Sequence, residues 1–168
     1  MKKSTPYKLI FALNRSSQGF TLVELLVVII ILGILSAIAL PNFLKQVGKA
    51  RDVEFRNAVG TINRGQQAFH WERQVFADGT TFQETFRALN VTINSGYIDD
   101  YVFETTDTNA TIQLVNNNFK ADGTKAYAGG TFFQDGDYFT IACQSLDVES
   151  QIAAPLTATD CGVNERLK

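Results

Sequence analysis

The hydrophobic pattern of the chain begins with a long apolar run. Residues 20–40 read FTLVELLVVIIILGILSAIAL, and Glu24 is their only ionisable side chain. A helix of this length rises about 30 Å, which matches the hydrocarbon core of a bilayer. The run therefore predicts one membrane-spanning helix. A carboxylate inside a bilayer costs about 2.5–3.5 kcal/mol on insertion scales, so we expect Glu24 to have a positively charged partner.

Helical periodicity continues beyond this run. Apolar side chains recur at three- and four-residue steps or their multiples, at Leu44, Val47, Phe55, Ala58, Ile62 and Phe69. Together with the span, this stripe predicts one helix of about fifty-five residues whose second half faces a core. Gly48, Gly60 and Gly65 weaken such a helix, and we expect them where another backbone or a sheet comes close.

The periodicity changes after residue 77. The sequence ADGTTF ends the helix, and residues 81–89 predict a short helix because Phe82, Phe86 and Leu89 share one face. Four segments rich in aromatic and β-branched residues then alternate with turn sequences, at residues 97–105, 110–119, 125–134 and 138–146. The predicted fold class is α+β, with a long N-terminal α-helix packed on a small four-stranded antiparallel β-sheet.

Charge is distributed unevenly along the chain. Residues 1–19 hold four of the fifteen basic residues and none of the seventeen acidic ones. Basic residues before a span favour a cytoplasmic position for that end, so we expect the chain after residue 41 to be periplasmic. Between residues 74 and 165, three basic residues accompany thirteen acidic ones. That balance disfavours nucleic-acid binding unless a local basic patch is built.

The two cysteines, Cys143 and Cys161, fall in the part predicted to be exported. Oxidation is expected there, and two cysteines with a single histidine make a poor zinc site, so we interpret them as one disulfide. The bond would close a C-terminal loop, which removes about 3 kcal/mol of unfolded-state entropy in the simple model.

Catalytic and cofactor signals are weak. The single histidine, His70, lies among aromatic residues and is better interpreted as a packed or surface side chain than as a base or ligand. Phosphate-binding glycine loops and metal-ligand spacings are missing from the sequence, so we expect no enzyme, no cofactor and no metal. The sequences DGD (135–137) and ADG (121–123) are explained more simply as turns than as calcium ligands.

The stretch GFTLVELLVVIIILGILSAIALPNF resembles the N-terminal signature of type IV pilins and type II secretion pseudopilins. The resemblance implies that a prepilin peptidase cleaves after Gly19 and methylates the new terminus at Phe20, a junction that precedes the apolar run and so retains the span. In the family that terminus lies close to the acidic residue, here Glu24. The amino group of Phe20 is therefore the expected partner of Glu24 in assembly. Gly33 and Pro41 also match, and imply a stretch that loosens in assembled pili.

The resemblance implies a division of the chain into four parts. These are a cleaved basic leader (1–19), a transmembrane or filament-core half of the helix (20–41), an amphipathic half (42–76) and a periplasmic β-sheet head with a disulfide loop (77–168). The segments NRGQQAFHWERQVFA, AYAGG and FTIACQS are similar to the pilin-like group common in cyanobacteria, sometimes labelled with secretion subunits G and H. Residues 146–162 would then lie on the filament surface.

The function implied is that of a structural pilus subunit for motility, adhesion or DNA uptake. Its expected partners are other pilins in a homo-oligomeric or mixed filament, the prepilin peptidase, an inner-membrane assembly platform with motor ATPases, and an outer-membrane secretin. The subunit would be a single-pass inner-membrane protein before assembly and extracellular afterwards. Two alternatives stay open: a type II secretion pseudopilin, and a single-span anchored periplasmic protein that binds DNA or another ligand.

Overall fold

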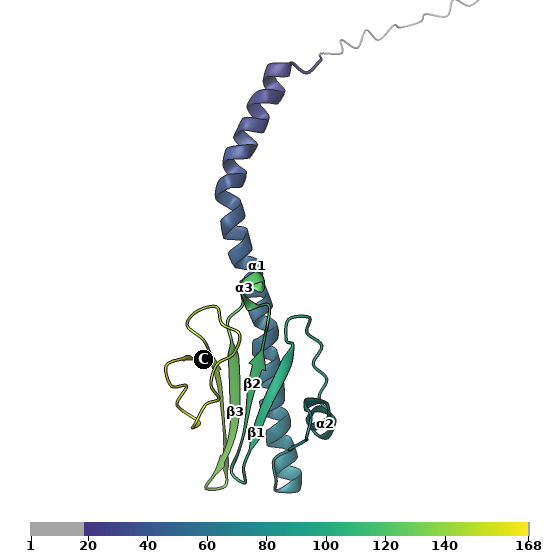
Figure 1. Cartoon of the computed structure of the whole chain (residues 1–168), viewed down its shortest axis with the longest axis vertical. Coiled ribbons are helices and arrows are strands. Elements are labelled where there is room, and N and C mark those ends of the chain that lie inside the picture. The colour runs from purple at the N-terminus through teal and green to yellow at the C-terminus, as the bar shows by residue number, and fades with distance from the viewer. Residues whose placement is uncertain (1–18, 168) are drawn as a thin grey trace, which may run out of the picture. The chain divides into compact units, whose positions relative to one another are not determined.

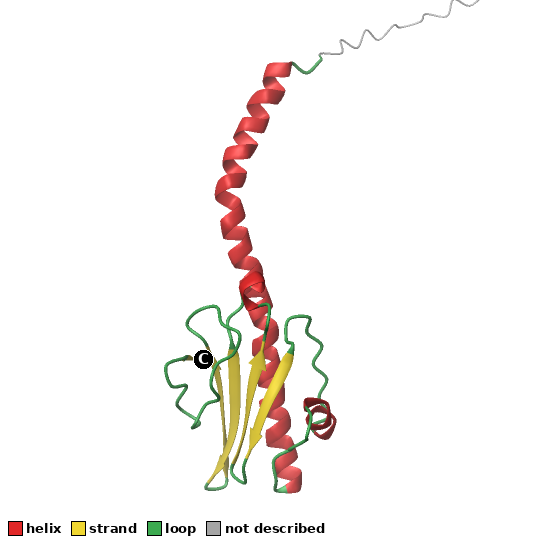
Figure 2. Ribbon diagram, in the orientation of Figure 1, coloured by secondary structure: helices red, strands yellow, loops and turns green. Residues whose placement is uncertain are grey.

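The structure, a computed structural model, describes residues 19–167, so that residues 1–18 of the predicted leader (1–19) lie outside the described residues (Figure 1). The chain divides into two compact units between Leu40 and Pro41, and helix α1 (Leu22–Arg73) contributes to both. We call the unit that begins at Pro41 the head. Its other elements are α2 (Phe82–Ala88), β1 (Asp100–Thr105), β2 (Asn109–Val115), α3 (Phe119–Asp122), β3 (Tyr127–Gln134), β4 (Asp137–Gln144) and β5 (Glu165–Arg166) (Figure 2).

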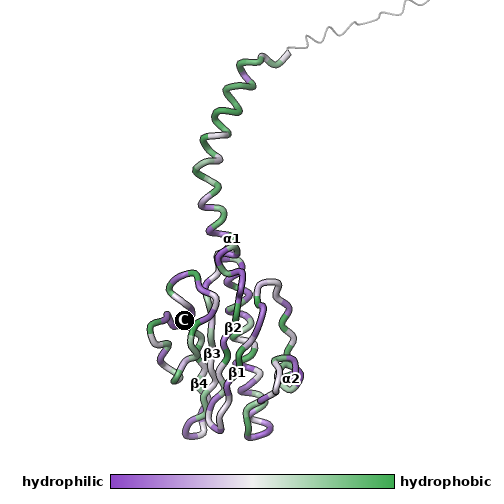
Figure 3. Tube along the Cα trace, viewed as in Figure 1, coloured by the Kyte–Doolittle hydropathy of each residue, from purple (hydrophilic) through white to green (hydrophobic). Residues whose placement is uncertain are grey.

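The first half of α1 is apolar and exposed. Among the described residues, α1 is the one helix long and apolar enough to cross a membrane. Every residue from 19 to 46 is exposed, and the trace coloured by hydropathy is mostly apolar along the first part of the helix (Figure 3). Such a surface needs a cover of lipid or protein, because each large apolar side chain gains about 1.5–3 kcal/mol on leaving water.

The second half of α1 supplies one side of the head's core. Phe55, Ala58 and Ile62 are buried, as the periodicity predicted, and so is Val59; they pack with Ile112 and other residues of the sheet. The prediction was wrong at the start of the stripe, because Leu44 is 61% exposed. The first buried residue of α1 is Gly48, so the part of the helix before it has no sheet to cover it.

The sheet is an antiparallel meander in the order β1-β2-β3-β4-β5 (Figure 1). The α+β class and the helix-on-sheet packing are confirmed. The sheet has five strands rather than the four predicted, because Glu165 and Arg166 pair with Gln144 and Cys143. A strand of two residues is too short to give a periodic signal in the sequence.

Each predicted strand was too wide at one end, and the differences are largest at β1 and β2. Strand β1 begins at Asp100 rather than at residue 97, and β2 ends at Val115 rather than at residue 119. The chain leaves β2 because Asn116 binds locally: its Oδ1 accepts from the Asn118 amide at 2.7 Å and its Nδ2 donates to Thr124 Oγ1 at 2.9 Å. These bonds form the turn that leads into α3.

The predicted short helix is present as α2. Thr81 caps it, accepting from the Glu84 amide through its side chain, as expected for an N-cap threonine. Its Phe86 ring contacts the rings of Tyr101 and Phe103 edge-on, at centroid distances of 4.8 and 5.9 Å. Helix α2 therefore packs against the first strand of the sheet.

The sheet face away from α1 has a smaller core of its own. It contains Ala126, Ala128, Ile141, Cys143 and Ile152. Ile152 comes from the C-terminal loop and is 6% exposed, so this loop covers part of the second face. Most of the loop's other apolar side chains remain outside the core; Leu156, for example, is 86% exposed.

Candidate functional site

The start of α1 is organised around Glu24. Its Oε2 accepts from the Thr21 amide at 3.0 Å and from the Thr21 hydroxyl at 2.9 Å, while the Glu24 amide donates to Thr21 Oγ1 at 3.2 Å. This reciprocal pattern is a capping box, which satisfies amide donors that a helix start leaves unpaired. The carboxylate is thereby directed toward the backbone that immediately precedes the helix.

Thr21 was missed as a site residue. The signal was present in the sequence, because a threonine followed three positions later by glutamate before an apolar run is a capping-box pattern. The capping box gives Glu24 neutral partners but no positive charge. Residues 20–40 contain no Lys, Arg or His, so this segment cannot supply a cation from its side chains.

Gly19 and Phe20 precede the helix and are exposed, with Phe20 74% exposed. A backbone that is exposed and outside regular structure suits a peptidase substrate. Gly33 and Pro41 both lie inside α1, which is helical through both positions. Pro41 has no amide hydrogen, so one helical hydrogen bond is lost there. Loosening between these two residues in a filament remains a prediction.

Polar side chains on the buried side of α1 form hydrogen bonds to the rest of the head. The sequence did not indicate these bonds. Asn63 Nδ2 donates to the Ile141 carbonyl at 2.9 Å. Gln66 binds Ala77 twice, donating from Nε2 to its carbonyl at 3.0 Å and accepting from its amide at 2.9 Å. These residues were overlooked because polar side chains on an amphipathic helix usually face solvent.

A second set of contacts joins α1 to the segment around α3. Arg51 Nη1 lies 3.2 Å from Asp122 Oδ1 and donates to the Asp122 carbonyl at 2.7 Å. This is the one ion pair found among the described residues. Asp122 belongs to the ADG sequence that was weighed as a calcium ligand, and its carboxylate here pairs with a guanidinium.

Burial shifts the pKa of several groups in the head, Asp52 and Tyr101 among them. Burial raises the pKa of Asp52, and the amide of Lys125, which donates to Asp52 Oδ1 at 3.0 Å, and the charge of Arg56 act in the opposite direction. Burial raises the pKa of Tyr101 to about 12. Both groups therefore favour the protonated form in the folded head more than in the unfolded chain.

The remaining candidates have structural positions. His70 is 2% exposed and its Nδ1 lies 2.6 Å from the Tyr138 hydroxyl, so it is a packed histidine. Asp135 and Gly136 have φ of 53° and 90° and form the turn between β3 and β4, as expected for a two-residue hairpin. Among residues 19–167, no cluster of three or more His, Cys, Asp or Glu is placed to hold a metal.

The structure contains the disulfide between Cys143 and Cys161, as predicted. Cys143 lies in β4 and is 1% exposed, whereas Cys161 is partly buried in the C-terminal loop. The bond therefore ties the loop to the second face of the sheet.

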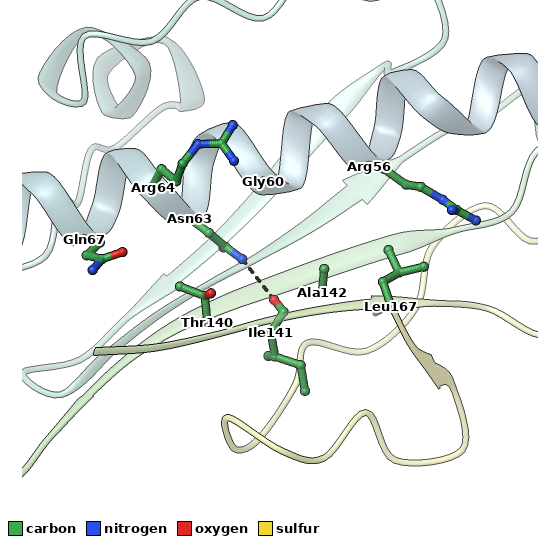
Figure 4. Close-up of a pocket in the computed structure, with 9 residues that line it drawn as sticks. All are labelled: Arg56, Gly60, Asn63, Arg64, Gln67, Thr140, Ile141, Ala142 and Leu167. Atoms are coloured by element: carbon green, nitrogen blue, oxygen red, sulfur yellow. Dashed lines mark hydrogen bonds between the residues drawn. The ribbon is translucent and has the colours of Figure 1, made fainter. Parts of the chain in front are cut away.

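A groove runs between α1 and the outer edge of β4 (Figure 4). Its volume is about 350 Å³, and it is lined by Arg56, Gly60, Asn63, Arg64, Gln67, Thr140, Ile141, Ala142 and Leu167. A second hollow shares Arg64 and Gln67 and extends to Trp71 and Tyr138. Polar and basic side chains dominate this edge of the head.

Comparison with known families identifies the chain. A family model for type IV pilin-like G and H proteins matches residues 52–163, more than half of the 168-residue chain. A prokaryotic N-terminal methylation motif matches residues 14–40, which include Gly19, Phe20 and Glu24. The chain belongs to the type IV pilin-like G and H family, and the resemblance seen in the sequence is confirmed.

Two curated proteins are similar to parts of the chain. Over 65 residues it is 37% identical to the type IV major pilin protein PilA of Myxococcus xanthus, which covers 39% of this chain and 30% of that protein. Over 101 residues it is 32% identical to the fimbrial protein EcpC of Eikenella corrodens, which covers 60% of this chain and 63% of that protein. The matched regions span less than two thirds of either relative.

Proposed function

We propose that the protein is a structural subunit of a type IV pilus. The observation that carries this proposal is the helix start: a methylation motif covers an exposed apolar segment, residues 20–40, whose one charged side chain, Glu24, is held in the first turn by Thr21. A one-span anchor needs the apolar surface but not a charge placed there. A filament subunit uses both.

Cleavage after Gly19 creates the missing cation. The new amino group on Phe20 lies one residue before Thr21, whose amide is bound to the Glu24 carboxylate. Unit charges 4 Å apart attract by about 1 kcal/mol in water and by about 4 kcal/mol at an effective dielectric constant of about 20. The ion pair between the Phe20 amino group and the Glu24 carboxylate, formed within a subunit or between neighbours, fixes the axial position of each helix as it leaves the bilayer.

The apolar half of α1 then forms the filament core. Before assembly the segment spans the inner membrane, with the basic leader in the cytoplasm and the head in the periplasm. In the filament, neighbouring helices cover the surface that lipid covered before. Gly33 and Pro41 weaken the helix between them, which allows the packed helices to adjust and the filament to extend.

The machinery that this function requires is supplied by partners. A prepilin peptidase processes the leader, motor ATPases on an inner-membrane platform drive extrusion, and a secretin opens the outer membrane. The described part of the head presents a first strand with alternate exposed side chains and a disulfide-bound loop, through which other pilins can be contacted.

Two substitutions at Glu24 test the proposal. Glu24→Gln keeps an oxygen acceptor for Thr21 but removes the charge, whereas Glu24→Ala removes both. We expect both variants to be inserted and cleaved normally, and both to yield at least tenfold less protein in sheared filaments. Glu54→Gln, at an exposed acidic position on the same helix that keeps an acceptor for Ser95, is the control. Normal filaments from Glu24→Gln would refute the charge pairing.

A further inference from the structure

The two edges of the sheet differ in charge. Strand β1 forms one edge. At the other edge the two-residue β5 pairs with Cys143 and Gln144, and the groove lies beside the preceding part of β4. Between Arg87 and Lys120 the chain has no basic residue, and the four acidic residues there, Asp99, Asp100, Glu104 and Asp107, are exposed. The β1 strand and its flanking turns therefore carry only acidic charges, with Arg87 on the neighbouring α2, while the opposite edge carries Arg56 and Arg64 together with the exposed acids Asp137 and Glu165.

Glu104 and Asp107 are the available carboxylates at the acidic edge. Asp99 accepts from the Asn117 amide at 2.6 Å and Asp100 from the Tyr101 amide at 2.8 Å. Within the described residues, no hydrogen bond or ion pair involves the side chains of Glu104 or Asp107. Both project from the β1–β2 hairpin with their charge open to a partner.

Arg64 is the available cation at the other edge. Arg56 donates to Gln144 Oε1 at 2.9 Å and has Asp52 and Glu165 within electrostatic range. Arg64 has only a 3.4 Å contact from Nη2 to the Thr61 hydroxyl and forms no ion pair with any described residue. Figure 4 shows its guanidinium beside Gly60, above the groove.

An aromatic surface lies next to Arg64. Trp71 is 71% exposed and contacts Tyr138, with ring centroids 6.4 Å apart. Arg64 and Trp71 line the same hollow. Glu72 is the carboxylate in this lining, and it lies two helical turns from Arg64, about 12 Å along the axis. An exposed tryptophan beside an unpaired arginine is the composition of a binding surface.

Both features lie at the same end of the head. The Phe133 amide donates to the Thr108 carbonyl at 2.8 Å, so the β1–β2 turn is beside the end of β3. Phe133 pairs with Tyr138 across the β3–β4 hairpin, and Tyr138 lies in the hollow with Arg64. The acidic turn and the Arg64–Trp71 hollow are therefore level with each other on opposite edges of one sheet.

We propose that the Arg64–Trp71 hollow binds the Glu104–Asp107 edge of a second copy of this chain. The charges are complementary, and because they lie on opposite edges of one sheet, each copy presents both halves of the contact. In such a heterologous contact, a pair of copies still has one free hollow and one free acidic edge. Further copies can therefore be added by the same contact. The proposal rests on the pilus function and assigns a head-to-head contact within it.

Charge exchange in the full-length chain tests this contact. Arg64→Glu should lower the protein in sheared filaments at least fivefold, and combining it with Glu104→Arg and Asp107→Arg should restore most of the loss. Lys120→Glu, an exposed cation on α3 and outside both halves of the contact, is the control and should assemble normally. Failure of the combined variant to recover, with all variants folded and processed, would overturn the contact.

Cross-linking separates this proposal from the pilus function itself. Filaments of the Arg64→Cys, Asp107→Cys double variant should give a ladder of disulfide-linked multimers on oxidation, and neither single variant should do so. If the wild-type protein forms filaments but the double cysteine variant gives no ladder, the contact is overturned and the pilus function stands. Absence of wild-type filaments would reject the function. Binding of short single-stranded DNA to sheared filaments is a separate measurement. If the DNA binds wild-type filaments but not Arg64→Glu filaments, and the double cysteine variant gives no ladder, the hollow is assigned to nucleic acid instead.

Discussion

The carbonyl oxygen of Gly123 lies 2.6 Å from the position that a Cβ on Gly48 would occupy. Gly48 is in α1, and Gly123 ends α3 in a left-handed conformation with φ of 66°. This close approach brings the α3 segment onto the helix, where Arg51 then pairs with Asp122. A glycine that weakens α1 locally is thus explained by a backbone contact.

Gly48→Ala should destabilise the head by about 1–3 kcal/mol, because the added methyl group meets a backbone atom that cannot rotate away. Gly60→Ala is the control, since its nearest neighbour is the flexible Arg64 side chain at 3.4 Å. There we expect a gain of up to about 1 kcal/mol from helix propensity. Urea unfolding of the full chain in detergent measures both, and equal effects at the two positions would contradict the assignment.

Gln66→Ala should cost about 2–4 kcal/mol, because it leaves the amide and carbonyl of Ala77 without their partner and each such buried group costs about 1–3 kcal/mol. Gln67→Ala removes the same side chain from a partly exposed neighbouring position and should have little effect. The urea midpoints of the two variants compare them directly. A Gln66→Ala variant as stable as the Gln67→Ala variant would show that the double hydrogen bond is not needed.

The stability of the head should fall between about pH 10 and pH 12. The pKa of Tyr101 is raised by burial to about 12, above its ordinary value of 10.0. The neutral phenol therefore contributes stability that is fully present below pH 10 and is lost as pH rises through the folded-state pKa. Burial raises the pKa of Tyr127 in the same direction. Tyr101→Phe should reduce the alkaline loss seen in urea midpoints; an unchanged pH profile would contradict this.

Removing the disulfide should destabilise the C-terminal loop. Cys143→Ala with Cys161→Ala opens a loop with a sequence separation of 18, for which the chain-entropy model gives about 3 kcal/mol. Without the bond, the loop keeps its attachment to the second core at Ile152 but loses the one at Cys161. We therefore expect the loop to become protease-sensitive before the sheet unfolds. Limited proteolysis followed by mass analysis checks this. Cleavage in the sheet at the same rate as in the loop would be inconsistent with it.

Periodicity predicted the fold because α1 and four of the strands are long enough to show it. The stripe containing Phe55 and Ile62 was identified correctly, whereas Leu44 belonged to the same pattern but had no sheet against it. The two-residue β5 could not be found, since its pairing with β4 depends on the path of the whole C-terminal loop. Its position is a tertiary effect.

The site was only partly predictable for a related reason. Glu24 is conspicuous because it is the one charge in an apolar run, and Thr21 was within reach of a capping-box search. Gln66 and Arg64 are both polar helix residues, and nothing in their local sequence separates the buried one from the one in the groove. Only the position of the sheet does so.

The intact mass of the protein in sheared surface filaments, compared with that in membranes, tests the central claim most directly. We predict an abundant filament species that begins at N-methylated Phe20 and is lighter by the two hydrogens lost in the Cys143–Cys161 bond. Filaments built from chains that retain residues 1–19 would contradict the account, and so would processed protein that is found in membranes but never in filaments.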